Sequence, residues 1–411
     1  MYDAIVVGAR CAGAPTALLL ARKGYKVLLL DRGTFPSDMP FSNHYMHQTG
    51  SARLKRWGLL DALKASNCPP ITTNHFDYGA FSLTGSPVPA EGGVTEAFAP
   101  RRIKLDPILV NAAVKSGAEL REGFSAQEVL FENGQVTGIR GHQKNGTTIT
   151  EKARITIGAD GMFSVVAKAV QAPEYKTGPA MEGSWYAYFS GVPMVGWHLW
   201  LRPGNVIFAY NTNDNLSLIG VAFAARDLPM VRANVEEHHS RVIAEQAPEL
   251  WERMQAGKRE SRYVGGAIPS HVRKPYGPGW ALVGDAGYQK DPCTASGITD
   301  AFGSAEWLAE AIDAGLSGRQ PLEQALAAYE QTRNQTELPY FDLTTQLAAL
   351  EPPPVEVQQL LEALQHNPEQ RSRFFGMLAH TVPVPEFFSP ENIQAILNRQ
   401  GNSKQKGVGV S

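Results

Sequence analysis

The stretch Gly8-Ala9-Arg10-Cys11-Ala12-Gly13 lies between an apolar strand predicted at 3–9 and a helix predicted at 14–24. A strand, a glycine turn and a helix together aim backbone N–H groups and the positive helix end at a pyrophosphate. Gly8 permits the tight turn, and Gly13 lets helix and strand approach closely. The usual middle glycine is Arg10 here, so its side chain must either turn away from the ligand or run along the phosphates as a cation.

Asp31 ends the next apolar strand, predicted at 25–31, and Arg32 follows it. A carboxylate at this place can accept hydrogen bonds from the ribose hydroxyls of a dinucleotide. The alternative is a buried helix–strand pair with an accidental glycine spacing. Strand, turn, helix and acid all fall in register, which favours a dinucleotide site, but the turn does not separate NAD from FAD.

Two later motifs bear on that choice. The first contains Asp160, Gly161 and Ser164, and the second contains Gly284, Asp285, Pro292 and Gly297. In the second, an apolar strand delivers Asp285 to a sheet edge. The helix that begins near Gly297 and Ile298 presents N–H groups and its dipole to an electron-rich ring.

At these residues the chain resembles the para-hydroxybenzoate hydroxylase-like superfamily of FAD proteins, over about residues 1–345. This superfamily comprises the group A flavin monooxygenases with their halogenase and prenyl-reductase relatives. The resemblance implies an α/β fold: a Rossmann-like FAD-binding domain (GR2/PHBH-like) with an inserted antiparallel β-sheet substrate domain and a helical C-terminal region. The expected parts are 1–75, 100–180 and 270–345 for FAD, 76–99 and 181–269 for substrate, 346–400 as C-terminal helices, and 401–411 as a flexible tail.

The resemblance also implies roles for individual residues. Asp285 would bind a ribityl hydroxyl, Pro292 would lie beside the isoalloxazine ring, and Gly297 and Ile298 would hold its pyrimidine edge. An arginine before the helix at 104–117 would lie against FAD, with Arg102 preferred and Arg101 equally available; a solvated helix-entry charge is the alternative. The remaining expected cofactor contacts are Gly8, Arg10, Ala12, Gly13, Asp31, Arg32, Asp160, Gly161 and Gly284.

The loop FSNHYMHQTG falls where relatives line flavin and substrate, so His44 and His47 are candidate catalytic proton-transfer groups. A structural role is the alternative for each histidine. In the predicted substrate sheet, aromatic residues alternate along SWYAYFSGVP, and one row must face an interior. The candidate pocket residues are Tyr186, Tyr188 and Tyr210, with ordinary core packing as the alternative.

Composition limits the partners. Lys plus Arg is 38 and Asp plus Glu is 40, so the formal net charge of −2 gives no reason to expect nucleic acid or a membrane surface. No apolar run is long enough for a membrane span, and the N-terminus shows no signal-peptide pattern. Three cysteines, few and far apart, argue against a zinc cluster or a disulfide framework. We expect a cytoplasmic monomer or homodimer without a metal.

The predicted function is that of an NAD(P)H- and O2-dependent monooxygenase that hydroxylates a small aromatic or polycyclic substrate through a C4a-peroxyflavin. Tyr288 replaces the histidine of many hydroxylases, and Ala167 and Lys168 stand where an arginine often follows the serine. NADH, NADPH or a separate reductase therefore remain open as reductants. The halogenase Trp-x-Trp-x-Ile-Pro signature is absent from the sequence. The alternatives are a flavin-dependent reductase or dehydrogenase, and a non-catalytic FAD-binding redox protein.

Overall fold

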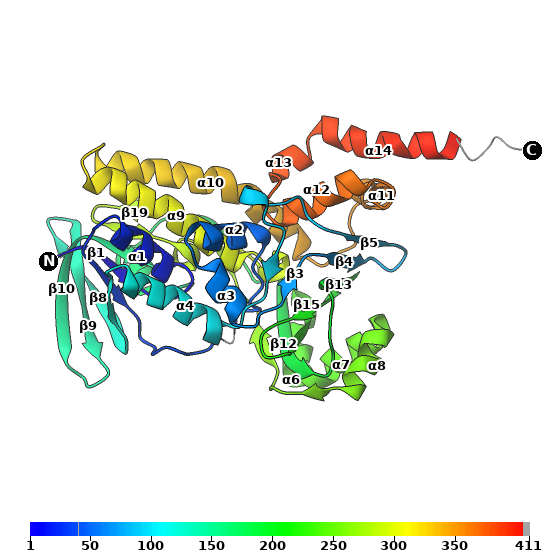
Figure 1. Cartoon of the computed structure of the whole chain (residues 1–411), viewed down its shortest axis with the longest axis horizontal. Coiled ribbons are helices and arrows are strands. Elements are labelled where there is room, and N and C mark those ends of the chain that lie inside the picture. The colour runs from blue at the N-terminus through cyan, green and yellow to red at the C-terminus, as the bar shows by residue number, and fades with distance from the viewer. Residues whose placement is uncertain (40, 406–411) are drawn as a thin grey trace, which may run out of the picture.

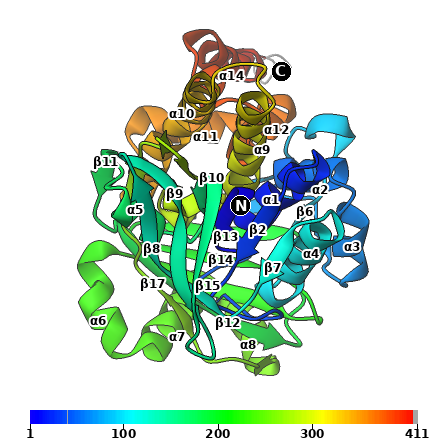
Figure 2. The same ribbon diagram turned by 90° about the vertical axis from the view of Figure 1, so that its left-hand side faces the viewer.

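A central parallel sheet contains the strands that precede the three motifs. The computed structural model describes residues 1–39 and 41–405, the last eight by backbone only. Strand β1 (Tyr2–Val7) lies between β10 (Thr148–Gly158) and β2 (Val27–Leu30), and both pairings are parallel. Strands β20 (Trp280–Leu282) and β7 (Glu119–Arg121) extend this sheet on either side, and β19 (Tyr276–Gly277) forms one edge. The part of the sheet from β10 past the N-terminus to β2 and β7 can be followed in Figure 2. The central strands β1, β2 and β20 are short and mostly apolar, as expected for a sheet buried on both faces.

Helices cover this sheet. Helices α1 (Gly13–Arg22), α4 (Arg102–Lys115) and α9 (Gly297–Leu316) pack in one apolar core on one face. A second core on the other face includes side chains of β8 (Phe124–Glu132), β9 (Gln135–Gln143) and α5 (Val165–Ala169). The antiparallel meander β8–β9–β10 turns at Asn133-Gly134 and Asn145-Gly146, as predicted, and β10 then enters the main sheet.

The second large sheet is mostly antiparallel, in the order β16-β12-β15-β14-β13-β4-β5, with β17 also on β12. The pairing of β4 with β13 is parallel. Its strands are β4 (Asn74–Asp77), β5 (Ser82–Gly85), β12 (Glu182–Ser190), β13 (Trp197–Arg202), β14 (Asn205–Asn211), β15 (Ser217–Ala224), β16 (Lys258–Arg259) and β17 (Val264–Gly266).

Both faces of this sheet are buried. The row with Trp185, Ala187 and Phe189 packs on helices α6 (Leu228–Ala233), α7 (Val235–Gln246) and α8 (Pro248–Ala256). The row with Tyr186 and Tyr188 belongs to a core shared with the C-terminal helices. Two small sheets complete the β structure: β11 (Glu174–Gly178), β18 (Ser270–Arg273) and β21 (Tyr288–Gln289), and β3 (Pro70–Ile71) with β6 (Ala97–Phe98).

The C-terminal part is helical (Figure 1). After α10 (Leu322–Leu347) come α11 (Val355–Leu364), α12 (Pro368–Leu378), α13 (Val384–Phe387) and α14 (Pro390–Gln405). Helix α14 continues through 401–405, the first residues of the expected tail, and 406–411 lie outside the described residues. The α/β fold with its second sheet and helical C-terminal region is confirmed; the exact domain limits stay a prediction.

Some elements differ from the sequence-based expectation. The segment SARLKRWGLLDALKA at 51–65, whose spacing predicts a single helix, lies in two helices, α2 (Gln48–Arg56) and α3 (Leu60–Ala65), because Gly58 has a φ of +73° between them. The helix expected at 233–256 divides into α7 and α8 at Pro248, which cannot continue a helix.

Candidate active site

The glycine turn is closely packed: Gly13 lies against Gly8, and Gly8 lies against the residue that follows β10. A Cβ on Gly13 would lie 1.7 Å from the carbonyl oxygen of Gly8, and a Cβ on Gly8 would lie 2.3 Å from the oxygen of Ala159. Helix α1 begins at Gly13 without a side-chain cap. Its first N–H groups therefore lack a side-chain acceptor, which is the condition for holding a pyrophosphate.

The three motifs of the sequence converge at this turn. Ala159 and Asp160 lie against Gly8, and a Cβ on Gly284 would lie 2.6 Å from that of Ala12. The strands that carry the motifs explain the convergence, since β20 pairs with β10 and β10 pairs with β1, all in parallel. Parallel strands bring their carboxyl ends to one edge, where ligands of such sheets bind.

Arg10 is held by helix α4 and not by the turn. Its guanidinium lies 2.5 Å from a carboxylate oxygen of Asp106 and 2.9 Å from the hydroxyl of Ser37. The Asp106 side chain is fully buried and also binds Arg102, with the Arg102 Nε atom at 2.8 Å. This arrangement favours the first alternative for Arg10, a side chain directed to α4.

The two neighbouring arginines differ in environment. Arg102 is buried, and its charge lowers the pKa of Asp285 while burial raises it more. Arg101 instead pairs with Asp38 and Asp214 near the surface, and its guanidinium lies over the ring of Tyr188. Arg102 thus lies nearer to the motif residues than Arg101 does, and its contact with FAD stays a prediction.

Asp31 and Asp160 support the turns by hydrogen bonds. The Asp31 carboxylate accepts from the backbone N–H of Ala9 at 2.8 Å and of Gly33 at 2.7 Å, whereas Arg32 is exposed. The Asp160 carboxylate accepts from the Ser164 hydroxyl and the Val165 N–H, and so stabilises the start of α5. The backbone of Asp160–Gly161 lies next to Gly8, while its carboxylate is already engaged.

The segment from Asp285 to α9 fits an elongated cofactor. Asp285 is half-buried, and none of the described residues donates a hydrogen bond to its carboxylate. Burial raises the pKa of this carboxyl to about 6. Helix α9 begins at Gly297 without a side-chain cap, and a Cβ on Gly297 would meet nothing within 4 Å. An open helix start and an available carboxylate are what a flavin with a ribityl chain requires.

His47 lies against this helix start. Its backbone N–H donates to the Thr299 hydroxyl at 3.1 Å, and its Nε2 atom lies 3.0 Å from the Thr294 carbonyl. Burial lowers the pKa of His47 to about 4, so the ring is neutral at neutral pH. Pro292 and Ile298 belong to the same segment; Ile298 is buried and Pro292 half-buried.

His44, in the loop before α2, packs against the substrate sheet. Its Nε2 atom shares a hydrogen bond with the Tyr188 hydroxyl, and its Nδ1 atom is buried without a partner among the described residues. Burial, with the charges of Arg102 and Arg101, lowers the pKa of His44 well below its usual value. A neutral imidazole with one free nitrogen can accept or donate a proton there.

The three candidate tyrosines face the loop that carries His44. The Tyr186 hydroxyl donates to the Ser42 carbonyl at 2.8 Å, and the Tyr210 hydroxyl donates to the Asn43 carbonyl at 2.7 Å. Burial raises the pKa of Tyr188 to about 12. The tyrosine row and the loop therefore form one aromatic and phenolic layer, and the opposite row of β12 is ordinary core.

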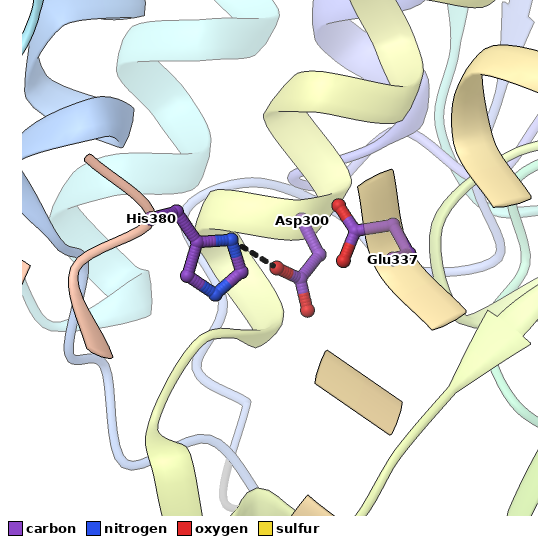
Figure 3. Close-up of side chains that lie close together, drawn as sticks. All are labelled: Asp300, Glu337 and His380. Atoms are coloured by element: carbon purple, nitrogen blue, oxygen red, sulfur yellow. Dashed lines mark ion pairs between the residues drawn. The ribbon is translucent and has the colours of Figure 1, made fainter. Parts of the chain in front are cut away.

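A buried cluster of ionisable side chains escaped the sequence analysis (Figure 3). The ligand atoms of Asp300, Glu337 and His380 lie within 4.8 Å of one another, and Lys290 forms an ion pair with Asp300. His380 comes from the turn after α12 and stacks on Tyr340 at 3.7 Å between ring centroids. These residues lie far apart in the sequence and form no motif with a fixed spacing. The sequence could indicate only that Asp300 and Glu337 lie on predicted helices.

The expectation of no metal site stays a prediction. Among the residues described, no helix is both long and apolar enough to cross a bilayer.

Comparisons with known proteins agree with this geometry. The family model described as "FAD binding domain" matches residues 1–338. A digeranylgeranylglycerophospholipid reductase of Methanocella arvoryzae is 26% identical over 343 residues, 80% of this chain and 82% of that protein. Aklavinone 12-hydroxylase DnrF of Streptomyces peucetius is 30% identical over 208 residues, 46% of this chain and 40% of that protein.

The fold also has solved counterparts. The flavin-dependent brominase Bmp2 superposes with a TM-score of 0.81 at 18% sequence identity, covering 98% of this chain and 99% of that one. At this identity the likeness shows the fold alone. The family match over most of the chain, together with the converging motifs, shows that this protein belongs to the FAD-binding family of para-hydroxybenzoate hydroxylase-like flavoproteins.

Proposed function

We propose that this FAD-dependent oxidoreductase is a monooxygenase that uses NAD(P)H and O2 to hydroxylate a small aromatic or polycyclic compound. The observation that carries the proposal is the layer of Tyr186, Tyr188 and Tyr210 against His44, with His47 next to the start of α9. Aromatic rings suit a flat substrate. Neutral histidines suit proton transfer from a hydroxyl group.

The residues of the chain would divide the work as follows. The turn at Gly8–Gly13 would hold the pyrophosphate, Asp31 the adenosine ribose, Asp285 the ribityl chain, and the N–H groups at Gly297 the pyrimidine edge. When bound, FAD supplies two-electron transfer and the activation of O2.

Two histidines and the tyrosine layer would act on the substrate. His44 would accept a substrate proton at Nδ1, while Tyr188 holds the ring through Nε2. His47, bound to Thr294 and Thr299, would orient the loop beside the α9 start. The burial of both rings excludes water from the layer.

A reductase is the second candidate. The similarity to the Methanocella reductase over 80% of this chain favours it, because that protein's name states a reduction. The similarity to aklavinone 12-hydroxylase favours hydroxylation but covers 46% of the chain. We favour the monooxygenase because the layer facing the loop is phenolic and histidine-containing, whereas a purely aliphatic chain would gain nothing from these polar groups. A non-catalytic FAD-binding protein is the third candidate.

The test is oxidation of NADPH and NADH by the FAD-loaded protein with a panel of phenols and polycyclic aromatics, with and without O2. The proposal expects substrate-stimulated oxidation that needs O2, and a product that carries oxygen from isotopically labelled O2. A reduced product formed without O2 would establish the reductase instead. Absence of turnover with NADPH, NADH and chemically reduced FAD would leave the binding protein. His44→Gln should lower kcat while FAD content is unchanged, and Tyr78→Phe, a tyrosine outside the layer, serves as its control.

A further inference from the structure

The cluster behind the start of α9 contains the carboxyl groups of Asp300 and Glu337 and the ammonium group of Lys290, which contacts Asp300. Lys290 and Asp300 form the ion pair through one oxygen of Asp300. The other oxygen, Oδ1, and the Oε2 atom of Glu337 are buried without a hydrogen-bond partner among the described residues. Both side chains are more than nine-tenths buried. The ion pair is therefore complete without Glu337, whose carboxyl group forms no ion pair of its own with any described residue.

Burial and the charge of Asp300 raise the pKa of Glu337 more than the positive charges of Lys290, Arg53 and Arg333 lower it, and none of these cations forms an ion pair with Glu337 among the described residues. His380 lies 3.7 Å from Asp300 through Nδ1 and donates to or accepts from Ser296 through Nε2, and burial lowers its pKa well below the usual value. Arg333 binds Asn334 and the Gly287 carbonyl, and Arg53 pairs with Glu306. The further titratable groups facing this region are Asp285, Tyr288, Tyr329 and Tyr340.

We propose that Glu337 is a proton-binding site of the flavin pocket: a neutral carboxylic acid that lies near Asp300 and loses or gains its proton as the charge at the start of α9 changes. The proposal rests on FAD binding but not on hydroxylation. It makes Glu337 a positioning residue, because it acts through Asp300 and the helix start.

Position connects Glu337 to the cofactor site. A small cavity is lined by Gly284, Asp285, Asp300 and Glu337, so it reaches from the expected ribityl carboxylate to the acid pair. Asp300 lies in the first turn of α9, three residues after Gly297. A charge on Asp300 and a charge on a cofactor at the start of α9 would be about one helical turn apart, and charges at such a distance interact strongly in a buried environment. Consistent with this, burial and the negative charge of Asp300 raise the pKa of Glu337 to about 8.

A divalent cation is the competing occupant, since one histidine and two carboxylates form a common ligand set. The ammonium group of Lys290 already occupies Asp300 and would repel the ion. The proton is therefore favoured, and the metal becomes an outcome of the test.

The first experiment is infrared difference spectroscopy of the FAD-loaded protein across pH, in the wild type and in Glu337→Gln. The proposal expects a carbonyl band of a protonated carboxylic acid at neutral pH that disappears above about pH 8 and is missing from the variant. Glu323→Gln, an exposed position on the same helix, should keep the band. A band unchanged by Glu337→Gln would overturn the proposal. So would one tightly bound zinc or manganese per chain that both Glu337→Gln and His380→Asn abolish.

The second experiment measures the FAD midpoint potential against pH and does not depend on substrate turnover. Reduction adds negative charge near α9, so Glu337 should take up a proton on reduction above about pH 8. The wild-type potential should then fall more steeply with pH than that of Glu337→Gln, by up to about 30 mV per pH unit, a tenfold change in equilibrium constant for two electrons. Equal slopes would refute the link to the flavin. If Glu337→Gln fails to fold, Glu337→Asp replaces it in the infrared experiment. The shorter acid should shift the band of Glu337 and leave that of Glu182, another buried acid whose pKa is raised, in place; a spectrum identical to the wild type would contradict the proposal. Failure of hydroxylation would leave both measurements unaffected.

Discussion

Replacing Asp106 by Asn should destabilise the protein strongly. The Asp106 carboxylate is fully buried and binds Arg10 at 2.5 Å and Arg102 at 2.8 Å. The change leaves a buried arginine, Arg102, and a largely buried one, Arg10, without their counter-ion. Removing one partner of a buried ion pair costs about 3–5 kcal/mol. We expect the free energy of unfolding to fall by an amount in this range.

The assay is urea unfolding followed by circular dichroism, with excess FAD and after FAD removal. The FAD-free measurement isolates the ion pair, because a ligand that binds only the folded protein adds its own stabilisation. The control is Asp214→Asn, which removes the half-exposed partner of Arg101 and should cost about 0–1 kcal/mol. If Asp106→Asn cost no more than this control, the account of Arg10 as a residue anchored on α4 would be wrong.

Three further outcomes test the site. Gly13→Ala should abolish FAD binding and destabilise the fold, because its Cβ would lie 1.7 Å from the Gly8 carbonyl oxygen. Gly297→Ala should fold normally and lose only FAD affinity, because its Cβ would meet no protein atom within 4 Å. Fluorescence titration with FAD and thermal melting measure the two effects. The pKa of His47 is about 4 in the folded protein and 6.5 in the unfolded one, so the unfolded state binds more protons between these pH values. The contribution of His47 to the free energy of unfolding should therefore fall by up to about 3 kcal/mol as pH falls through this window. His47→Gln should remove this contribution in urea unfolding measured across pH. Asp285→Asn should keep the fold and lower the FAD content of the purified protein, and full flavin occupancy would contradict the role given to this carboxylate.

Local patterns predicted most of the first sheet. Asn133-Gly134 and Asn145-Gly146 adopt positive φ at Asn133, Gly134 and Gly146, and the hairpins follow from these turns. The glycine turn, the acid after β2 and the strand before Asp285 likewise depend on residues close in sequence. Such signals can be recognised because each short segment satisfies its own backbone requirements.

Long-range contacts were beyond the same reasoning. The partner of Arg10 is 96 positions away at Asp106, and a salt bridge of that kind leaves no local pattern. His380 adopts a left-handed φ of +61° after α12 and reaches α9 only through the packing of the C-terminal helices. Strand β13 also went unrecognised, although the buried Trp197 and Leu199 alternate in it with the half-buried His198 and Trp200.

The place of β1 between β10 and β2 bears on how the protein is made in the cell. Strand β1 is translated shortly before its neighbour β2, whereas its other neighbour β10 follows some 140 residues later and the α9 start nearly 300 residues later. At about 5–20 residues per second, translation separates these events by about 15–60 s. The nascent chain must therefore keep one edge of β1 unpaired until β10 has been made, and the complete FAD site can form only after the α9 start has been translated.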